Sequence, residues 1–415
     1  MSVYICVFFY SIIQEAIYSP DTYSYLDANM FRHPGYVVFL RVFTSVFRNQ
    51  YELFVVAFQL LFGLIATHFT IQRFSILFNF NYLTKIIALL ILLFPFFEPL
   101  YVANNLCSEG LSYPLYLIFI TLSFELIYNE NQKKLKYLII AYILLALTRG
   151  QFIFTPFLFA IVYFLKHRKE SYKDFKFWRL TILFLAPLIV NLADRTYHKL
   201  KDGLFVQTPF TYINTAASAY FVSKDSDKSL FKNEDYKTIF IKCFTHLQEN
   251  NLLHSSIKRK TNTEYYSYFH KNVPPIANLT VQKFGVEYYY YDKHLTIASS
   301  EFEADNAAKA ATFILIKHNF KKWINIYYAN LTHAFKSQIL LLFIALIALF
   351  SFIKLVKQYN YKYAMLFLFS SLTISNAMLV AFASHSIMRY LFYNYIFIFL
   401  ILITMIKQFK NVKNS

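Results

Sequence analysis

The chain has 415 residues, of which 57% are hydrophobic and only 15% charged, and its mean hydropathy is +0.39. Long uncharged runs recur along it, which excludes an ordinary soluble domain and indicates many transmembrane helices. The net charge of +18 does not indicate nucleic-acid binding, because the cations lie in short loops between apolar runs.

The first apolar run, residues 1–18, is short for a span and is interrupted at Gln14 and Glu15. No basic residue precedes it and no small-residue cleavage site follows, so it does not fit a signal peptide. We interpret it as a first transmembrane helix and expect the true start to lie upstream. The apolar runs predict about ten transmembrane helices: 1–18, 51–72, 84–100, 109–128, 135–148, 151–165, 178–194, 336–353, 364–384 and 389–406.

Two of these runs, 135–148 and 151–165, are short, and a re-entrant pair is the alternative interpretation. Either way, lysine and arginine concentrate in alternate connections, whereas the short connections of the other phase carry few. The positive-inside rule then makes the cation-rich connections and both termini cytoplasmic. The cations counted as cytoplasmic are Arg73, Lys85, Lys133, Lys134, Lys136, Lys166, Arg168, Lys169, Lys173, Lys176, Arg179, Lys354, Lys357, Lys362, Lys407, Lys410 and Lys413.

One long polar stretch, 195–335, interrupts the pattern on the outer side, and its length exempts it from the charge rule. It contains an alanine-rich helical pattern from Glu301 to Phe320. We therefore predict an all-α polytopic membrane protein in three parts. They are an N-terminal transmembrane module (1–194), a mostly helical extracytoplasmic domain (195–335), and C-terminal transmembrane helices with a cytoplasmic tail (336–415).

The first outer loop, residues 19–50, is predicted to hold two interfacial helices. Ser19 suits an N-cap, Pro20 the first helical turn, and Asp21 would be stabilised there by the helix N-terminus. We expect this helix to run from Pro20 to Phe31 and to end at His33-Pro34-Gly35. Residues 36–47 form a second apolar helix that is too short to span and is interrupted by Arg41.

Ionisable residues from five separate segments fall at the outer ends of helices or in outer loops. Any one of them could simply reach toward water, but charges beside hydrocarbon are costly and usually functional. For the whole set we favour a shared polar cavity. The set is Asp21, Asp27, Arg32, His33, Glu98, Glu109, Arg149, His385 and Arg389.

The order Asp-x-x-x-Tyr from Asp21, then Arg-x-Pro-Gly-Tyr from Arg32, then an apolar stretch, resembles the first outer loop of GT-C-fold glycosyltransferases. Among these are protein O-mannosyltransferase and aminoarabinose-transferase relatives, which use polyprenyl-phosphate sugars. Similar elements follow in the family's order over 1–194 and roughly 300–406. They are Phe94-Pro95 with Leu106-Cys107-Ser108-Glu109-Gly110, Leu147-Thr148-Arg149-Gly150 with Pro156, and Met388-Arg389-Tyr390.

The chain departs from the family in its short first span and in the Asp-Thr at 21–22, where many relatives have Asp-Glu. The stretch 195–300 shows no resemblance. The resemblance implies that a sugar, hexosyl or pentosyl, moves from a polyprenyl-phosphate donor in the lipid bilayer to a glycan, lipid or protein acceptor. Transfer would occur on the extracytoplasmic face, in a bacterial inner (plasma) membrane.

Asp21 is the candidate general base for the acceptor, and Asp27 competes with it. Six helical residues separate the two carboxylates by about −120°, so only one is expected to face the cavity, and the order relative to Arg32 favours Asp21. Guanidinium groups match phosphate oxygens, so the arginines are candidates for the donor phosphate. The expected phosphate ligands are Arg32, Arg149 and Arg389, and the expected substrate-binding residues are His33, Tyr25, Glu109 and Asp27.

Several of these residues also have a purely structural interpretation. Glu109 is also explained as a helix-start charge, and Arg389 as an interfacial anchor beside Tyr390. Asp225-Ser-Asp227 matches the D-x-D of nucleotide-sugar enzymes, but its loop favours a solvated turn. Neither cysteine nor histidine spacing predicts a metal site. A divalent metal is possible but has no support in the sequence, and no cofactor is assigned with certainty.

Three further features are noted for later comparison. Asn278-Leu-Thr and Asn330-Leu-Thr fit the N-glycosylation pattern. The Tyr288–Tyr291 string could stack on sugar rings or pack on the bilayer. Three histidines are expected at the surface: His246, His254 and His270.

Two other functions remain as alternatives. A polysaccharide polymerase or ligase is also polytopic with one large outer loop, but such enzymes concentrate arginines in that loop. A transporter usually shows two matching halves and broken helices at mid-membrane, whereas this chain has six glycines and no evident duplication. The sequence favours the glycosyltransferase.

Overall fold

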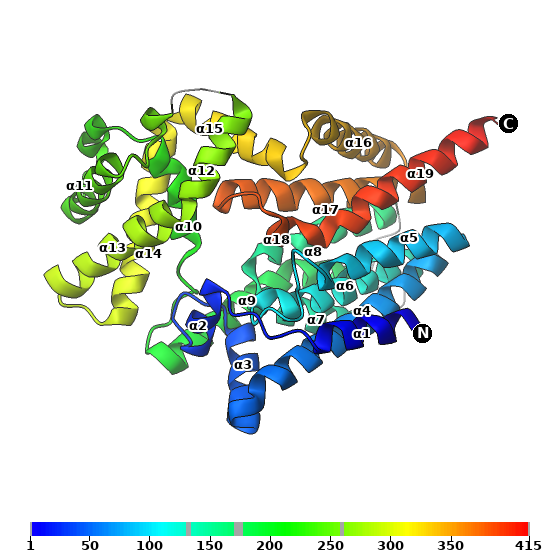
Figure 1. Cartoon of the computed structure of the whole chain (residues 1–415). Coiled ribbons are helices and arrows are strands. Elements are labelled where there is room, and N and C mark those ends of the chain that lie inside the picture. Colours follow the sequence, from blue (N-terminus) through cyan, green and yellow to red (C-terminus); the bar gives the residue numbers. More distant parts are fainter. Residues whose placement is uncertain (1, 130–133, 170–176, 258–260, 414–415) are drawn as a thin grey trace. The chain divides into compact units, whose positions relative to one another are not determined.

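The computed structural model describes residues 2–129, 134–169, 177–257 and 261–413 (Figure 1). Within these ranges every regular element is helical, and the one β pairing is an isolated bridge between Ile17 and Asn105. The predicted cytoplasmic cations Lys133, Lys173 and Lys176 lie outside the described residues.

Seven helices in the described part of the chain have the length and apolar composition needed to cross a membrane. They identify the chain as a polytopic helical membrane protein. Three further apolar helices match predicted spans but are shorter: Ser2–Ile12, Tyr82–Phe96 and Leu135–Thr148. The seven candidate spans are Pro34–Leu77, Ser108–Asn129, Gly150–His167, Trp178–Asp202, Gln338–Lys357, Tyr361–Ala383 and Met388–Ile406.

The chain forms two compact units. Unit 1 comprises residues 1–194, 343–376 and 391–415, and unit 2 comprises 195–342 and 377–390. The helices α9, α16, α17 and α18 each belong partly to both. Unit 1 holds α1 Ser2–Ile12, α2 Pro20–Leu26, α3 Pro34–Phe47, α4 Tyr51–Leu77, α5 Tyr82–Leu93, α6 Ser108–Asn129, α7 Leu135–Thr148, α8 Thr155–His167, α19 Tyr395–Lys413, and parts of α9 Phe177–Asp202, α16 Gln338–Lys357 and α17 Tyr361–Ala383.

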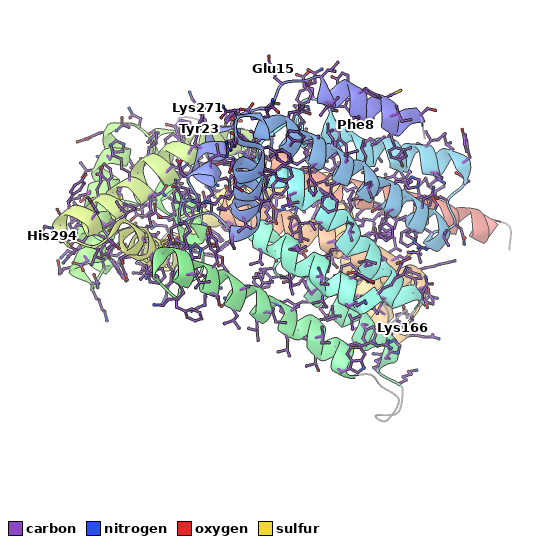
Figure 2. All side chains as sticks on the ribbon, turned by 90° about the horizontal axis from the view of Figure 1, so that it is seen from below. Phe8, Glu15, Tyr23, Lys166, Lys271 and His294 are labelled. Carbon is purple, nitrogen blue, oxygen red and sulfur yellow. The ribbon has the colours of Figure 1, made fainter. Side chains whose placement is uncertain are left out.

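At the centre of unit 1 lies α6, which is buried along almost its whole length. It packs against α4 and α7, and Thr70 and Thr121 share a hydrogen bond of 2.9 Å across the α4–α6 contact. Near its end the buried Glu125 forms ion pairs with Arg73 (3.3 Å) and Lys134 (2.5 Å). Figure 2 shows Tyr23 on α2 and Lys166 on α8 at opposite ends of the helices of this unit.

The first outer loop folds as two short helices, but the first is shorter than predicted. Ser19 is the N-cap of α2 and Asp21 lies in its first turn, as expected. However, α2 ends at Leu26, because Ala28 adopts a positive φ of 52° that a right-handed helix cannot accommodate. The prediction of a helix to Phe31 was therefore wrong. The predicted second helix, 36–47, is α3, which begins two residues earlier.

A sharp break separates α3 from α4, although together they make one long apolar segment. Arg48 has a φ of 47°, and a 3₁₀ turn over Arg48–Gln50 follows it. Figure 1 shows the two helices running in different directions. By length and composition, Pro34–Leu77 counts as one apolar segment. The backbone nevertheless makes α3 a separate helix that precedes the predicted span.

Unit 2 is also helical, and its core is formed by small and aromatic side chains of α10, α12 and α14. The Asp305 carboxylate accepts bonds from the backbone N–H groups of Tyr212 and Ile213 at the start of α10, at 2.9 and 3.0 Å. The helices here are α10 Thr211–Phe221, α11 Glu234–Glu249, α12 Asn262–Ile276, α13 Lys283–Glu287, α14 Ile297–His318, α15 Phe320–Ala334 and α18 Met388–Leu391.

Several side chains of unit 2 differ from the sequence-based expectation. Asp225 is exposed, but Asp227 is fully buried and accepts a bond from Asn319 at 2.8 Å, so the pair is not a solvated turn. His254 is buried against Tyr265, with 3.0 Å between Nε2 and the hydroxyl, and was wrongly placed at the surface.

The Tyr288–Tyr291 string divides between the core and the surface. Tyr288 and Tyr289 are buried, whereas Tyr290 and Tyr291 are exposed. At most the last two are available to a ligand or a bilayer.

Candidate functional site

Asp21 is positioned by backbone and hydroxyl contacts between α2 and the segment that precedes α6. The Ser19 N–H donates to Thr22 Oγ1 at 2.9 Å, and the Thr22 hydroxyl donates to the carbonyl of Leu106 at 3.0 Å. Two backbone hydrogen bonds of the Ile17–Asn105 bridge join the same segments: the Ile17 N–H donates to the Asn104 carbonyl (2.8 Å), and the Leu106 N–H donates to the Ile17 carbonyl (3.0 Å). The start of α2 is thereby fixed beside residues 104–107.

An ion pair joins Asp21 to Arg32, with 2.7 Å between Oδ1 and Nη2. Arg32 Nε donates to Ser24 Oγ at 2.7 Å, and the Ser24 hydroxyl donates to the Asp21 carbonyl at 2.7 Å. The guanidinium also lies 4.8 Å from the ring centroid of Tyr25. These contacts fold the chain back on itself after α2 and fix the orientation of Arg32.

Burial alone would lower the pKa of Arg32, but the neighbouring Tyr25 and Asp21 outweigh it and raise the pKa. Arg32 is therefore a permanent cation at this site.

A second ion pair lies deeper, between Glu109 at the start of α6 and Arg149 at the end of α7. The distance from Nη1 to Oε1 is 2.7 Å, and the two side chains are 4% and 11% exposed, respectively. Arg149 Nη1 also donates to Ser108 Oγ at 3.1 Å, and its Nε donates to Gln151 Oε1 at 2.6 Å. The guanidinium is thus held by a carboxylate, a hydroxyl and a side-chain amide.

Two glycines bring the first outer loop against the end of α7. An added Cβ at Gly35 would lie 2.6 Å from Thr148 Oγ1, and one at Gly150 would lie 2.7 Å from His33 Nε2. Both distances are shorter than real Cβ contacts, so both positions require glycine for this approach. His33 therefore lies directly against the residue that follows Arg149.

Tyr25 connects the two ion pairs. Its side chain is buried, and it meets the ring of Tyr36 edge-on with 5.0 Å between centroids. Burial raises the pKa of Tyr25, and Cys107, Glu109 and Asp21 add to the increase while Arg32 opposes it. Members of both ion pairs therefore act electrostatically on a single phenol.

The structure thus gathers six of the eight predicted site residues: Asp21, Tyr25, Arg32, His33, Glu109 and Arg149. Asp27 does not join them. It is the C-cap of α2 and is exposed, as the expected difference in helical face implied. Arg389 belongs to unit 2 and remains a prediction as a phosphate ligand.

Three contributing residues were not singled out from the sequence. Cys107 Sγ lies 4.0 Å from Asp21 Oδ2, Ser108 donates toward Glu109 at 3.4 Å, and Gln151 Nε2 donates to Asn376 at 3.2 Å. Cys107 and Ser108 stand immediately before Glu109 in a motif that the sequence does show. Gln151 carried no comparable signal.

The chemistry of the site is that of paired acids and bases at the ends of apolar helices. One carboxylate, Asp21, is 29% exposed and can meet an aqueous substrate, whereas Glu109 is enclosed. Across the described residues, no group of three or more histidine, cysteine, aspartate and glutamate side chains has an arrangement suited to a metal ion. Comparison of the chain with protein-family models, curated proteins and solved structures gave no match.

Proposed function

We propose that this protein is a GT-C-like membrane glycosyltransferase that moves a sugar from a polyprenyl-phosphate donor to an acceptor on the extracytoplasmic face. The observation that supports the proposal most is the convergence of two ion pairs, Asp21–Arg32 and Glu109–Arg149, from segments far apart in the sequence. Both pairs gather where α6 begins and α7 ends, at one end of the apolar helices.

Asp21 is proposed as the general base. It is the more exposed carboxylate of the two pairs, and a short helix and a hydrogen-bonded hydroxyl fix its position. A base must come within hydrogen-bonding reach of the proton that it removes. Arg32 occupies Oδ1, so the acceptor hydroxyl would approach the other carboxylate oxygen or displace the guanidinium.

Arg32 is the best-placed arginine for the donor phosphate. It is oriented by Ser24 and Tyr25 and lies beside the proposed base. Arg149 is more deeply engaged, because its Nη1 and Nε already donate to Glu109, Ser108 and Gln151. We propose that Arg149 adds positive potential and holds Glu109 in place, and Arg389 remains a candidate second phosphate ligand.

The proposed reaction is a single displacement. The acceptor oxygen forms a bond to the anomeric carbon of the sugar while the bond from that carbon to the phosphate oxygen breaks. The hydroxyl proton passes to Asp21, and polyprenyl phosphate departs with the electron pair. The positive charge of Arg32 would stabilise the departing phosphate, which is the usual role of such groups at a developing anion.

We also propose the finer topology expected from the sequence: about ten transmembrane segments, both termini in the cytoplasm, and a bacterial inner membrane. In that arrangement the short apolar helices α1, α5 and α7 complete the membrane domain. The unit 1 cluster would then face the extracytoplasmic side.

Two aspartates six residues apart supply a matched test. In a deletion strain, Asp21→Asn and Asp27→Asn would each be expressed in place of the native chain. Glycans and lipids of the envelope would then be profiled by mass spectrometry, with membrane levels of each variant measured in parallel.

We expect Asp21→Asn to lose a transferred sugar at normal protein levels, because the amide cannot accept the acceptor proton. Asp27→Asn should retain it, because Asp27 is exposed and contacts neither ion pair. Full transfer by Asp21→Asn would remove this residue from the mechanism. An unchanged profile on deletion of the whole chain would count against both the glycosyltransferase and the polymerase or ligase, and would favour the transporter alternative.

A further inference from the structure

A second cluster of basic side chains lies within unit 2. His270 on α12 and His333 on α15 flank the ring of Tyr266, and His385, which follows α17, contacts His270. Tyr266 stacks on His333 with 3.4 Å between ring centroids and on His270 with 5.4 Å, and His270 meets His385 edge-on at 4.8 Å. A chain of ring contacts thus links three imidazoles from three elements, from His333 through Tyr266 to His270 and on to His385.

Lys336 completes the cluster. Its ammonium group donates to Nε2 of His333 at 2.6 Å, and the residue itself is exposed. Burial lowers the pKa of Lys336, so its charge is incompletely solvated where it stands. In the part of the chain that the structure describes, neither Lys336 nor the three histidines pair with a carboxylate.

The segment that carries His385 is rigidly held. The amide of Asn330 donates to the carbonyls of Ala381 (3.0 Å) and Ser384 (2.9 Å) and accepts from the Ser386 N–H at 2.7 Å. The Tyr266 hydroxyl donates to the Ser386 carbonyl at 2.5 Å. The cluster is therefore a built feature of the fold.

Buried hydrogen-bonding capacity remains at this segment. Nδ1 of His385 and Oγ of Ser386 are enclosed and have no hydrogen-bond partner among the described residues. Such groups destabilise a fold unless something else satisfies them. Burial lowers the pKa of His333 and of His385 to about 4, with Lys336 and His270 contributing respectively, so the imidazoles are neutral at neutral pH. A neutral imidazole still offers one N–H donor.

Chain connectivity places the cluster at the boundary of the bilayer. Lys336 lies two residues before the candidate span that begins at Gln338. His385 lies between the candidate span that ends at Ala383 and the next, which begins at Met388. Since α16 and α17 are consecutive spans, the start of one and the end of the other share a membrane face.

We propose that His270, His333, Lys336 and His385 form a binding site for the phosphate group of a membrane lipid. One ammonium and several imidazole N–H donors match the three oxygens of a phosphate monoester, and no carboxylate of the described residues pairs with them. The level of the site, next to the ends of apolar helices, is the level of lipid headgroups. The site shares no residue with the Asp21 cluster, and its test does not depend on sugar transfer.

The test uses the purified full-length chain in detergent and two lipids that differ only in the phosphate. Phosphatidic acid and diacylglycerol with the same acyl chains would be titrated and their retention measured by native mass spectrometry. The variants are Lys336→Gln and, as a control, Lys321→Gln. Lys321 is an exposed lysine of α15 in the same unit, so the control removes the same charge outside the cluster.

We expect phosphatidic acid to be retained over diacylglycerol, and Lys336→Gln to weaken its binding about tenfold, which corresponds to about 1.4 kcal/mol. Lys321→Gln should remain within about twofold of the native chain. His385→Leu, which removes the imidazole donor, should also weaken binding, provided that its melting temperature equals that of the native chain. The proposal would be overturned if the two lipids were retained equally and inorganic phosphate did not bind. It would also be overturned if Lys336→Gln and Lys321→Gln had equal effects.

A competition experiment with inorganic phosphate distinguishes a lipid from a free phosphate compound as the ligand. Displacement of phosphatidic acid by inorganic phosphate supports a shared phosphate site that is filled by a lipid. Binding of inorganic phosphate that Lys336→Gln weakens, without any preference for phosphatidic acid, assigns the same chemistry to a free phosphate compound.

Discussion

The Glu109–Arg149 pair permits a quantitative test of the proposed site. Because the Glu109 side chain is 4% exposed and that of Arg149 is 11% exposed, neither charge is satisfied by bulk water if its partner is removed. Breaking a buried pair by neutralising one member typically costs about 3–5 kcal/mol. Glu109→Gln should fall near about 3 kcal/mol, because Arg149 keeps its bonds to Ser108 and Gln151.

Arg149→Gln should cost more, toward about 5 kcal/mol, because it leaves a carboxylate enclosed by apolar helices. The double variant should cost much less than the sum of the two, giving a coupling energy of about 2 kcal/mol. The free energies would be measured by titrating the purified chain with sodium dodecyl sulfate in mixed micelles and following helicity by circular dichroism.

The control for this cycle is an exposed pair of the same chemistry, Glu234 and Lys237 on α11, whose Glu234 side chain is 77% exposed. Glu234→Gln should change stability by no more than about 0.5 kcal/mol. If Glu109→Gln and Arg149→Gln were additive within about 0.5 kcal/mol, the two side chains would not be coupled. The proposal that Arg149 holds Glu109 in place would then be refuted.

Three further results are expected. Burial, with help from Asp202, raises the pKa of Glu301 to about 7, so the folded chain favours its neutral form and stability falls as pH rises from about 4.5 to 7. Glu301→Gln should remove that fall: its free energy of unfolding should equal that of the native chain at pH 4.5 and exceed it at pH 8, by up to about 3 kcal/mol. Asn330→Ala should destabilise the chain by about 2–3 kcal/mol in the same denaturation assay, because three buried hydrogen bonds are lost, and a glycan at Asn330 should be absent. Gly150→Ala should displace His33 and reduce sugar transfer in the envelope profile, and unchanged transfer would show that this contact is dispensable.

The membrane helices were predictable because their signal is compositional. A run of about twenty apolar residues needs no partner to be recognised, and the long predicted spans coincide with helices that meet the length criterion. One feature was not accessible in this way. The early end of α2 depends on the positive φ of Ala28, a residue with no general preference for that conformation. The separation of α3 from α4, in contrast, was predicted, with a short helix over 36–47 and a span over 51–72.

Most residues of the candidate site could be predicted from the sequence, but the ion pairs that they form could not. Sidedness placed Asp21, Arg32, Glu109 and Arg149 at one level, yet no pattern indicated that each arginine would bind a particular carboxylate. That outcome depends on tertiary packing, such as the close approach of Gly150 to His33. Burial of Asp227 likewise follows from the position of Asn319 on another element, which local composition cannot reveal.

The bridge between Ile17 and Asn105 has a consequence for how this chain can diverge. The proposed base is located by peptide groups, through the N–H of Ile17 and that of Leu106, and not by the identity of those side chains. Most substitutions at the exposed Ile17 would leave the proposed geometry intact, and proline, which lacks the N–H, is the exception. Two chains could therefore share this arrangement while showing little identity across the strand-like stretch that creates it.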